Sequence, residues 1–200
     1  KNGLSQAQFS VTGGAIRKII HSYTREAGVR SLERKIGELC RKYHVMVFSD
    51  EIHCDLCDPG QEYVPFASAS DTCADISITA ISASKAFNIA GLQTAAVFTP
   101  KEGLRNKIVR GLNTDEIAEP NSFAIQAIIA AFCEGEEWLN ELNAYIYRNK
   151  QIVREFISQN LPQIHVIDSQ ATYLLWIDCS GIADQTDELC EYLRKKAGLY

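Results

Sequence analysis

The stretch "DISITAISASKAFNIAGLQ" (residues 75–93) decides the fold class, because an apolar strand pattern runs directly into a polar cluster. Its first part, "DISITAI" (residues 75–81), has the continuous β-branched character of a strand buried within a parallel or mixed sheet. Lys85 follows this strand, with the small hydroxyl residues Ser82 and Ser84 beside it. Ligands of open α/β sheets bind at such strand ends. The stretch therefore predicts a ligand site at one edge of a sheet.

Two more apolar runs, one on each side of this stretch, favour an α/β architecture. "HVMVF" (residues 44–48) leads into the acidic "SDE" that contains Asp50, and "TAAVFTP" (residues 94–100) is stopped by Pro100. Because adjacent strands of a sheet bring their ends together, we expect Asp50 and Lys85 to lie near one another.

The C-terminal part of the chain combines helices with a second pair of strands. Residues 123–132 are apolar and alanine-rich, and large apolar residues recur at helical spacing until Pro162 stops the pattern. "IHVI" (residues 164–167) and "TYLLWID" (residues 172–178) have the pattern of strands. A last helix is predicted over residues 187–197, with Gly198 as its C-terminal cap.

The N-terminal part differs from the rest in charge and in periodicity. Residues 1–42 carry nine basic and three acidic residues, whereas the whole chain has 20 basic and 25 acidic residues. Apolar spacing predicts one helix that Thr12 caps and Gly28 ends, followed by a second helix up to Lys42. The chain therefore divides into a helical segment (residues 1–42), an α/β segment (43–120) and a segment with a second sheet (121–200).

Composition excludes several classes of function. The net charge of −5 speaks against a nucleic-acid partner, and no apolar run approaches the roughly 20 residues of a membrane span. The first ten residues lack the apolar core of a secretory signal, and the seven cysteines are typical of reduced thiols in the cytoplasm. Cys54 and Cys57 form one isolated CxxC without further ligands at metal spacing, so we expect no metal site.

The residues at the two strand ends suit the chemistry of pyridoxal 5′-phosphate (PLP). This cofactor needs a lysine amine to hold its aldehyde as an imine, a carboxylate near its pyridine nitrogen, and hydrogen-bond donors for its phosphate. Lys85, Asp50, Ser82 and Ser84 supply these groups in a suitable order. Each is weak evidence by itself, because a single lysine is commonly a surface charge and an aspartate after a strand is commonly a turn former.

"SDEIHCDL" (residues 49–56) together with "SASKAFNIAGLQ" (residues 82–93) resembles the fold-type I PLP-dependent enzymes. Within the class I/II aminotransferases, "FNIAGLQ" is most similar to the cystathionine β-lyase-like C–S lyases, and the resemblance spans about residues 36–200. Gln93 stands where many aminotransferases have a phosphate-binding arginine, which favours the lyase subgroup. The resemblance implies that residues 43–120 are part of the major, PLP-binding domain. Residues 121–200 would then be interdomain helices and part of the small domain.

The resemblance also implies a role for each site residue. Lys85 would form the imine with the cofactor and would later move the proton on the substrate Cα. Asp50 would pair with the pyridine nitrogen. The remaining candidates would surround the ring and the phosphate: Ile52 against the ring, His53 (a tyrosine in many relatives) near its phenolate oxygen, and Ser82 and Ser84 near the phosphate.

"YTREAGVRSLERKIGELCRK" (residues 23–42) resembles a different family, the small helical lid of the AAA+ ATPase in Lon proteases. That resemblance implies nucleotide sensing by Arg30, although a plain charge on a solvated helix face is an equally good interpretation. The chain has no phosphate-binding loop of the GxxxxGK[ST] kind. Residues 36–42 fit both families, so we expect a chimera whose two parts join in this helix.

These resemblances leave four functions open. The first is a C–S β-lyase that cleaves an amino-acid thioether such as cystathionine to a thiol, pyruvate and ammonia. The second is a PLP-dependent aminotransferase, the third a non-catalytic Lon-type lid fusion, and the fourth a remnant without function. In the family, cofactor-binding parts also precede Asp50, and Lon-like sequence occupies their place here. We therefore expect low or absent catalysis, exposed sheet edges and, as in relatives, a homo-oligomer.

Overall fold

The computed structural model describes residues 29–198 of the chain. The helix predicted between Thr12 and Gly28 lies outside these residues. The chain forms two compact units. Among the described residues, the first contains residues 29–52, 64–82 and 94–121, and the second contains residues 53–63, 83–93 and 122–198. Each unit is described by itself below.

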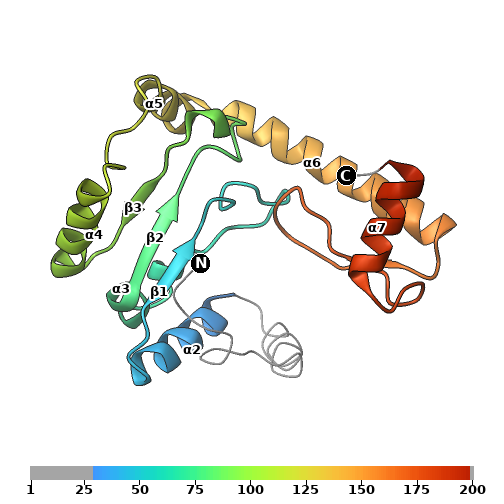
Figure 1. Ribbon diagram of the computed structural model, residues 1–200, viewed down its shortest axis with the longest axis horizontal. Coiled ribbons are helices and arrows are strands. Elements are labelled where there is room, and N and C mark those ends of the chain that lie inside the picture. Colours follow the sequence, from blue (N-terminus) through green and yellow to red (C-terminus); the bar gives the residue numbers. More distant parts are fainter. Residues whose placement is uncertain (1–28, 199–200) are drawn as a thin grey trace. The chain divides into compact units, whose positions relative to one another are not determined.

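The first unit is built on a three-stranded mixed sheet (Figure 1). Its strands are β1 (Val47–Asp50), β2 (Ser77–Ile81) and β3 (Ala96–Phe98), in the spatial order β1-β2-β3. β1 runs parallel to β2, with Asp50 opposite Ala80, and β3 runs antiparallel to β2. A strand forms at each of the three predicted apolar runs; β2 and β3 are shorter than their runs, whereas β1 is shifted toward the C-terminus and includes Ser49 and Asp50.

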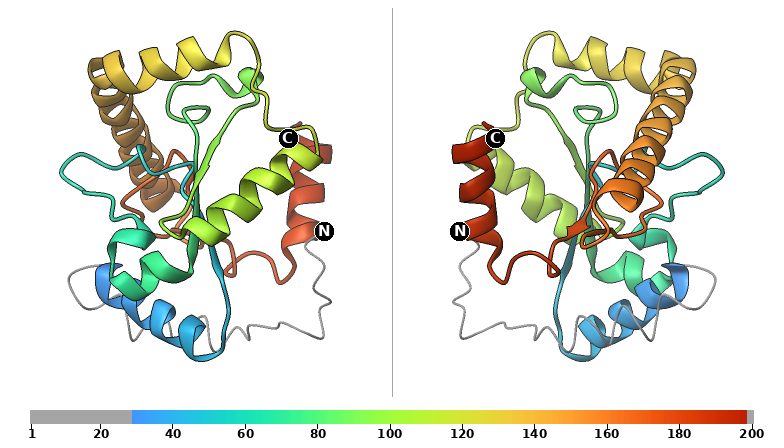
Figure 2. Two further views of the ribbon diagram at one scale, coloured as in Figure 1. Left: turned by 90° about the vertical axis from the view of Figure 1, so that its left-hand side faces the viewer. Right: turned by 90° about the vertical axis from the view of Figure 1, so that its right-hand side faces the viewer.

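Helices of the first unit lie on either side of these strands (Figure 2). The first unit contains α2 (Val29–Lys42), α3 (Asp71–Ile76), α4 (Glu102–Thr114) and the short 3₁₀ helix η1 (Phe66–Ser68). α2 is the second helix predicted in the N-terminal segment. α3 and α4 were not predicted; α3 is short and begins where the side chain of Ser70 accepts a hydrogen bond from the Cys73 N–H at 3.2 Å.

α2 packs closely against α3 because Gly37 has no side chain. A Cβ atom at position 37 would lie 2.5 Å from the Sγ of Cys73, well inside van der Waals contact. The Cys73 thiol is fully buried and contacts the Glu33 carbonyl oxygen at 3.5 Å. At the other end of the contact, Arg41 forms an exposed ion pair with Asp75 at 3.8 Å. The Lon-like helix is therefore an integrated part of the first unit.

The expectation that all three strands are buried on both faces is wrong. Every residue of β3 is exposed, and the Phe48 side chain of β1 is 62% exposed. β2 alternates between buried and half-buried residues. The physical reason is position, since only β2 has a hydrogen-bonded strand on each side within residues 29–198. Open edges and apolar faces of this kind were expected for a sheet fragment.

The second unit consists of helices and a small sheet. Its helices are α5 (Ala124–Glu134), α6 (Glu136–Asn160) and α7 (Thr186–Ala197), and the 3₁₀ helix η2 covers Ala90–Leu92. β4 (His165–Val166) pairs antiparallel with β5 (Ile177–Asp178). α7 ends at Gly198 in the left-handed conformation with φ +64°, as predicted.

Gly135 separates α5 from α6, where the sequence had suggested a single helical region. A Cβ atom here would collide with the Ala131 carbonyl oxygen and the Phe87 ring, so only glycine fits. No helix within residues 29–198 is both long enough and apolar enough to cross a membrane.

Candidate functional site

Asp50 and Ser82 mark the ends of the two parallel strands of the first unit. Asp50 is the last residue of β1, and its exposed carboxylate accepts a hydrogen bond from the Ile52 N–H at 3.2 Å. Ser82 directly follows β2, and its buried hydroxyl donates to the Thr94 carbonyl oxygen at 2.8 Å. Because β1 and β2 are parallel, these residues share one edge of the sheet. Asp50 and Ser82 therefore lie at neighbouring strand ends of the first unit, and the proximity of Asp50 to Lys85 stays a prediction.

Glu51 holds the chain in place beside Asp50. Its side chain is buried, and one carboxylate oxygen accepts from the Ser49 hydroxyl at 2.9 Å and from the Phe66 N–H at 3.1 Å. The Glu51 N–H donates to the Ala80 carbonyl oxygen at 2.8 Å, which extends the pairing beyond β1. The sequence analysis did not single out Glu51. Its acidic character, between two predicted site positions, gave no sign that it is a structural anchor.

Lys85 lies in a tight turn of the second unit. The turn is closed by hydrogen bonds from Phe87 N–H to the Ala83 carbonyl oxygen at 3.0 Å and from Ile89 N–H to the Ser84 carbonyl oxygen at 3.1 Å. Ala83 and Ala86 are buried, whereas the Lys85 side chain is exposed. Small residues thus fix the backbone and leave the amine accessible for chemistry.

The helices of the second unit anchor this turn through the residues that follow Lys85. The Trp138 indole N–H of α6 points to the Ala86 carbonyl oxygen at 3.4 Å. The Phe87 ring meets Phe132 of α5 edge to face, with 6.2 Å between ring centroids. Trp138 and Phe132 were interpreted from the sequence as packing residues, and here they pack against the turn that carries Lys85.

His53 also belongs to the second unit, as the first residue of the segment 53–63. Its imidazole is half-buried, and Nδ1 is buried without a hydrogen-bond partner among the residues described. The ring lies 5.4 Å from the Tyr173 ring, at an interplanar angle of 58°. Tyr173 was missed, because "TYLLWID" was read only as a strand. Its aromatic side chain beside a histidine is a feature that tertiary structure alone reveals.

Cys54 and Cys57 do not form a disulfide with each other in this structure. The Cys57 thiol contacts the Cys54 carbonyl oxygen at 3.5 Å. Burial, reinforced by the nearby Asp55 and Asp58 carboxylates, raises the pKa of the Cys57 thiol. A raised pKa keeps the thiol protonated and unreactive. Between residues 29 and 198, no group of three or more potential metal ligands occurs.

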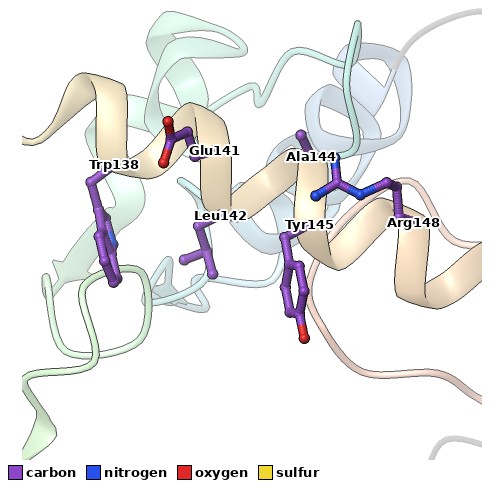
Figure 3. Close-up of a pocket in the computed structure, with 6 residues that line it drawn as sticks. All are labelled: Trp138, Glu141, Leu142, Ala144, Tyr145 and Arg148. Atoms are coloured by element: carbon purple, nitrogen blue, oxygen red, sulfur yellow. The ribbon is translucent and has the colours of Figure 1, made fainter.

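A surface groove of about 570 Å³ runs along α6 and contains none of the predicted site residues. Trp138, Leu142 and Tyr145 project to the same side of the helix (Figure 3). All of the lining residues come from this one helix. The groove is therefore an uncovered apolar helix face, and it does not define the candidate site.

The donor set fits PLP. An exposed primary amine (Lys85) can condense with an aldehyde, and a carboxylate at a strand end (Asp50) can accept a pyridinium N–H. The unpartnered Nδ1 of His53 offers a further polar contact. Arg30, the predicted nucleotide sensor, is exposed in the first turn of α2, far from this chemistry in the sequence.

Solved structures show to which fold the chain corresponds. The PLP-bound putative aminotransferase from Clostridium difficile 630 superposes with a TM-score of 0.82 at 31% identity, and covers 88% of this chain and 45% of its own. The fold is thus a part of the fold-type I PLP-dependent transferase fold, a partial α/β structure.

Sequence comparisons define the family. Residues 32–200 match the family "Aminotransferase class I and II", and the chain belongs to that family. The cystathionine β-lyase PatB of Bacillus subtilis is 43% identical over 162 residues, which are 81% of this chain and 42% of PatB. The chain therefore spans less than half the length of the curated relative and of the solved structure that it matches.

The N-terminal segment matches a second family. Residues 1–53 match the "Lon protease AAA+ ATPase lid domain". The Lon protease of Lachnoclostridium phytofermentans is 67% identical over 42 residues, which are 21% of this chain and 5% of that protease. The two matches overlap at residues 32–53, which include most of α2. The chain is a chimera of Lon-like and aminotransferase-like sequence, as predicted.

Proposed function

We propose that this chain carries the lysine-bearing half of a PLP-dependent C–S β-lyase. Its substrate would be a cysteine-derived thioether such as cystathionine. The observation that carries the proposal is the parallel pairing of β1 with β2, which sets Asp50 opposite Ala80 in the segment that leads to Lys85. The similarity to PatB supports a lyase over other members of the family.

Each site residue has a proposed part in holding the cofactor. Lys85 would bind its aldehyde, and Asp50 would keep its pyridine nitrogen protonated. Ile52 and His53 would lie at the ring. Ser84 and Ser82 would bind the phosphate, for which the Ser82 hydroxyl has to give up its hydrogen bond to the Thr94 carbonyl oxygen.

The proposed reaction requires this chain to remove the proton from the substrate Cα. PLP, when bound, supplies an electron sink for the negative charge that develops at the substrate Cα. Lys85 would remove the Cα proton as a general base. It would pass a proton to the departing sulfur as the C–S bond breaks, so that the group leaves as a thiol, and water would convert the remaining three-carbon unit to pyruvate and ammonia.

The arrangement of the chain suggests how the parts divide. We propose residues 1–42 as the Lon-like lid segment, 43–120 as part of the cofactor-binding major domain, and 121–200 as interdomain helices with part of the small domain. The open edge strands favour assembly into a homo-oligomer. None of the seven cysteines forms a disulfide, which suits the reducing cytoplasm. Nucleotide sensing by Arg30 stays a prediction.

An absorbance spectrum tests the proposal most directly. We expect the purified protein, mixed with PLP and dialysed, to keep a visible absorbance band that Lys85→Ala abolishes. Lys107→Ala, at another lysine exposed on a helix surface, is the matched control and should keep the band. A band that survives in Lys85→Ala, or that is absent from the unsubstituted protein, contradicts the proposal.

Product analysis separates the lyase from the aminotransferase. A lyase releases pyruvate and a thiol from cystathionine, whereas an aminotransferase releases a keto acid and leaves pyridoxamine phosphate. Because Lon-like sequence occupies the place of the family's first cofactor-binding parts, we expect turnover far below that of a complete relative. Substantial turnover by this 200-residue chain would contradict that expectation.

A further inference from the structure

A buried ion pair lies at the centre of the second unit. The Lys150 ammonium of α6 is 2.5 Å from the Asp58 carboxylate oxygen Oδ1, and only 2% of its side chain is exposed. The same ammonium lies 3.4 Å from the carbonyl oxygens of Ala171 and Thr172. An ammonium has three donor hydrogens, so these three acceptors use all of them.

A buried ion pair of this kind determines how segments pack together more than it adds to the stability of the fold. Removing two charges from water costs several kcal/mol per ion, and a well-packed apolar pair is often as stable. The pair here joins residues that are 92 positions apart in the sequence. The pair therefore determines which segment packs against α6 and which residue of that segment lies beside Lys150.

Lys150 fastens two backbone segments that already contact each other. Asp58 N–H donates to the Gln170 carbonyl oxygen at 2.9 Å, and Thr172 N–H donates to the Leu56 carbonyl oxygen at 2.6 Å. Between them Cys57 and Ala171 form an antiparallel bridge. The ammonium thus binds a side chain of one segment and two carbonyl groups of the other.

Thr172 shows that this arrangement is held against strain. Its φ is +61°, in the left-handed region that a β-branched residue rarely adopts. Such a conformation is unfavourable and persists only where its surroundings enforce it. The Lys150 contact and the Leu56 hydrogen bond enforce it here, together with the Leu174 N–H that donates to the Thr172 hydroxyl at 3.0 Å.

The two segments carry the histidine and the tyrosine of the candidate site. Leu56 N–H donates to the His53 carbonyl oxygen at 3.0 Å, which ties His53 to the first segment. Tyr173 directly follows the strained Thr172 in the second segment. The 5.4 Å separation of the two rings therefore depends on the contact between the segments.

We propose that Lys150, through its ion pair with Asp58, is a positioning residue that sets the orientation of the His53 imidazole against the Tyr173 ring. The purpose of this orientation rests on the proposed function, in which His53 lies at the cofactor ring. The positioning itself belongs to the chain without cofactor and is measurable there. This distinction allows the two proposals to fail separately.

Nuclear magnetic resonance of the cofactor-free protein tests the positioning. The His53 ring-proton signals, assigned with His53→Gln, report the ring current of Tyr173, and Tyr173→Leu gives their position without it. We expect the double variant Lys150→Met/Asp58→Asn, which leaves no unpaired buried charge, to shift these signals toward the Tyr173→Leu position. Lys150→Met alone should shift them in the same direction.

Two controls keep the result decisive. Lys195→Met removes an exposed ion pair with Glu191 in the same unit and should leave the His53 signals unchanged. The His165 signal of β4 should stay in place in every variant, which shows that the second unit is folded. Unchanged His53 signals in the double variant would overturn the positioning role. A clear shift in a protein that fails the PLP test would keep this role and refute only the proposed function.

Discussion

α2 and α6 are attached to their respective units by opposite means. α2 lies against α3 through shape, because Gly37 leaves room for the buried Cys73 thiol, and its ion pair at Arg41 is exposed. α6 is attached through charge, because Lys150 enters the interior and meets Asp58. The comparison shows that a close fit between small residues can be formed by helices from different families. A buried charge, in contrast, needs its specific partner.

The family matches explain why the difference lies where it does. Both families match residues 32–53, so α2 has to pack against α3 with side chains that also suit a Lon lid. Small residues at a helix contact meet that demand, since they need no specific partner. α6 lies wholly within aminotransferase-like sequence and keeps a pair that spans the unit.

The largest effect is expected for the charge-based attachment. Lys150→Met leaves the Asp58 carboxylate buried and unpaired, which costs about 3–5 kcal/mol of unfolding free energy. The double variant Lys150→Met/Asp58→Asn should recover most of this loss. Urea unfolding followed by circular dichroism measures both. A double variant no more stable than the single variant would show that the carbonyl contacts, and not the charge pair, hold α6.

The stability of the α2–α3 contact should be less sensitive to substitution. A compensating change in side-chain volume, and not in charge, should restore it. Gly37→Val forces two methyl groups toward the Cys73 thiol, and overpacking of this kind costs about 1–3 kcal/mol. Gly37→Ala/Cys73→Ala exchanges the volume across the contact and should be close to the unsubstituted protein in its urea midpoint. If Gly37→Val is as stable as the unsubstituted protein, α2 is not held by a close fit.

The smallest predicted effect on stability concerns Glu33, whose carboxylate lies on α2. Burial raises the pKa of Glu33, the Glu51 carboxylate raises it further, and Arg30 opposes the shift. The folded state therefore holds the Glu33 proton more tightly than the unfolded state does. Stability is lost as pH rises from the ordinary carboxyl range, near about 4.3, through the raised pKa.

Glu33→Gln removes this loss. We expect the variant to be more stable at pH 7 by roughly 0.5 kcal/mol, since solvent screens a half-buried group. The advantage should vanish below about pH 4, where Glu33 is protonated in both states. Urea midpoints across this pH range measure it, with Glu38→Gln, an exposed position on the same helix, as control. An advantage independent of pH would mean that ionisation of Glu33 is not its cause.

Local sequence patterns carried the prediction of most elements. Each of the five strands within residues 29–198 overlaps a predicted apolar run, although only the last two residues of the run 172–178 form β5, and Gly198 marked the end of α7. The short α3, with six residues, has too few positions to show a helical period. The apolar runs alone do not distinguish the exposed β1 and β3 from the more buried β2, because an apolar run has the same pattern whether or not another strand covers it.

The residues of the candidate site also fall into those that a local pattern predicts and those that only chain folding brings together. Lys85, Asp50 and the serines could be predicted because a motif names residue types at fixed spacing. Tyr173 was not found, because its partner His53 is brought to it by chain folding. Glu51 was passed over for a related reason, since its hydrogen bond to Phe66 joins segments that the sequence separates.

The sequence by itself determined which chemical groups this chain offers: an amine, a carboxylate and hydroxyls at predicted strand ends, joined to a Lon-like helix. Only the tertiary structure decided that β1 and β2 are parallel while β3 is antiparallel, and that Lys150 meets Asp58. The physical reason is the range of the forces involved. Backbone preference and apolar periodicity act between near neighbours, whereas strand direction and buried charge pairs depend on segments that meet only when the chain has folded.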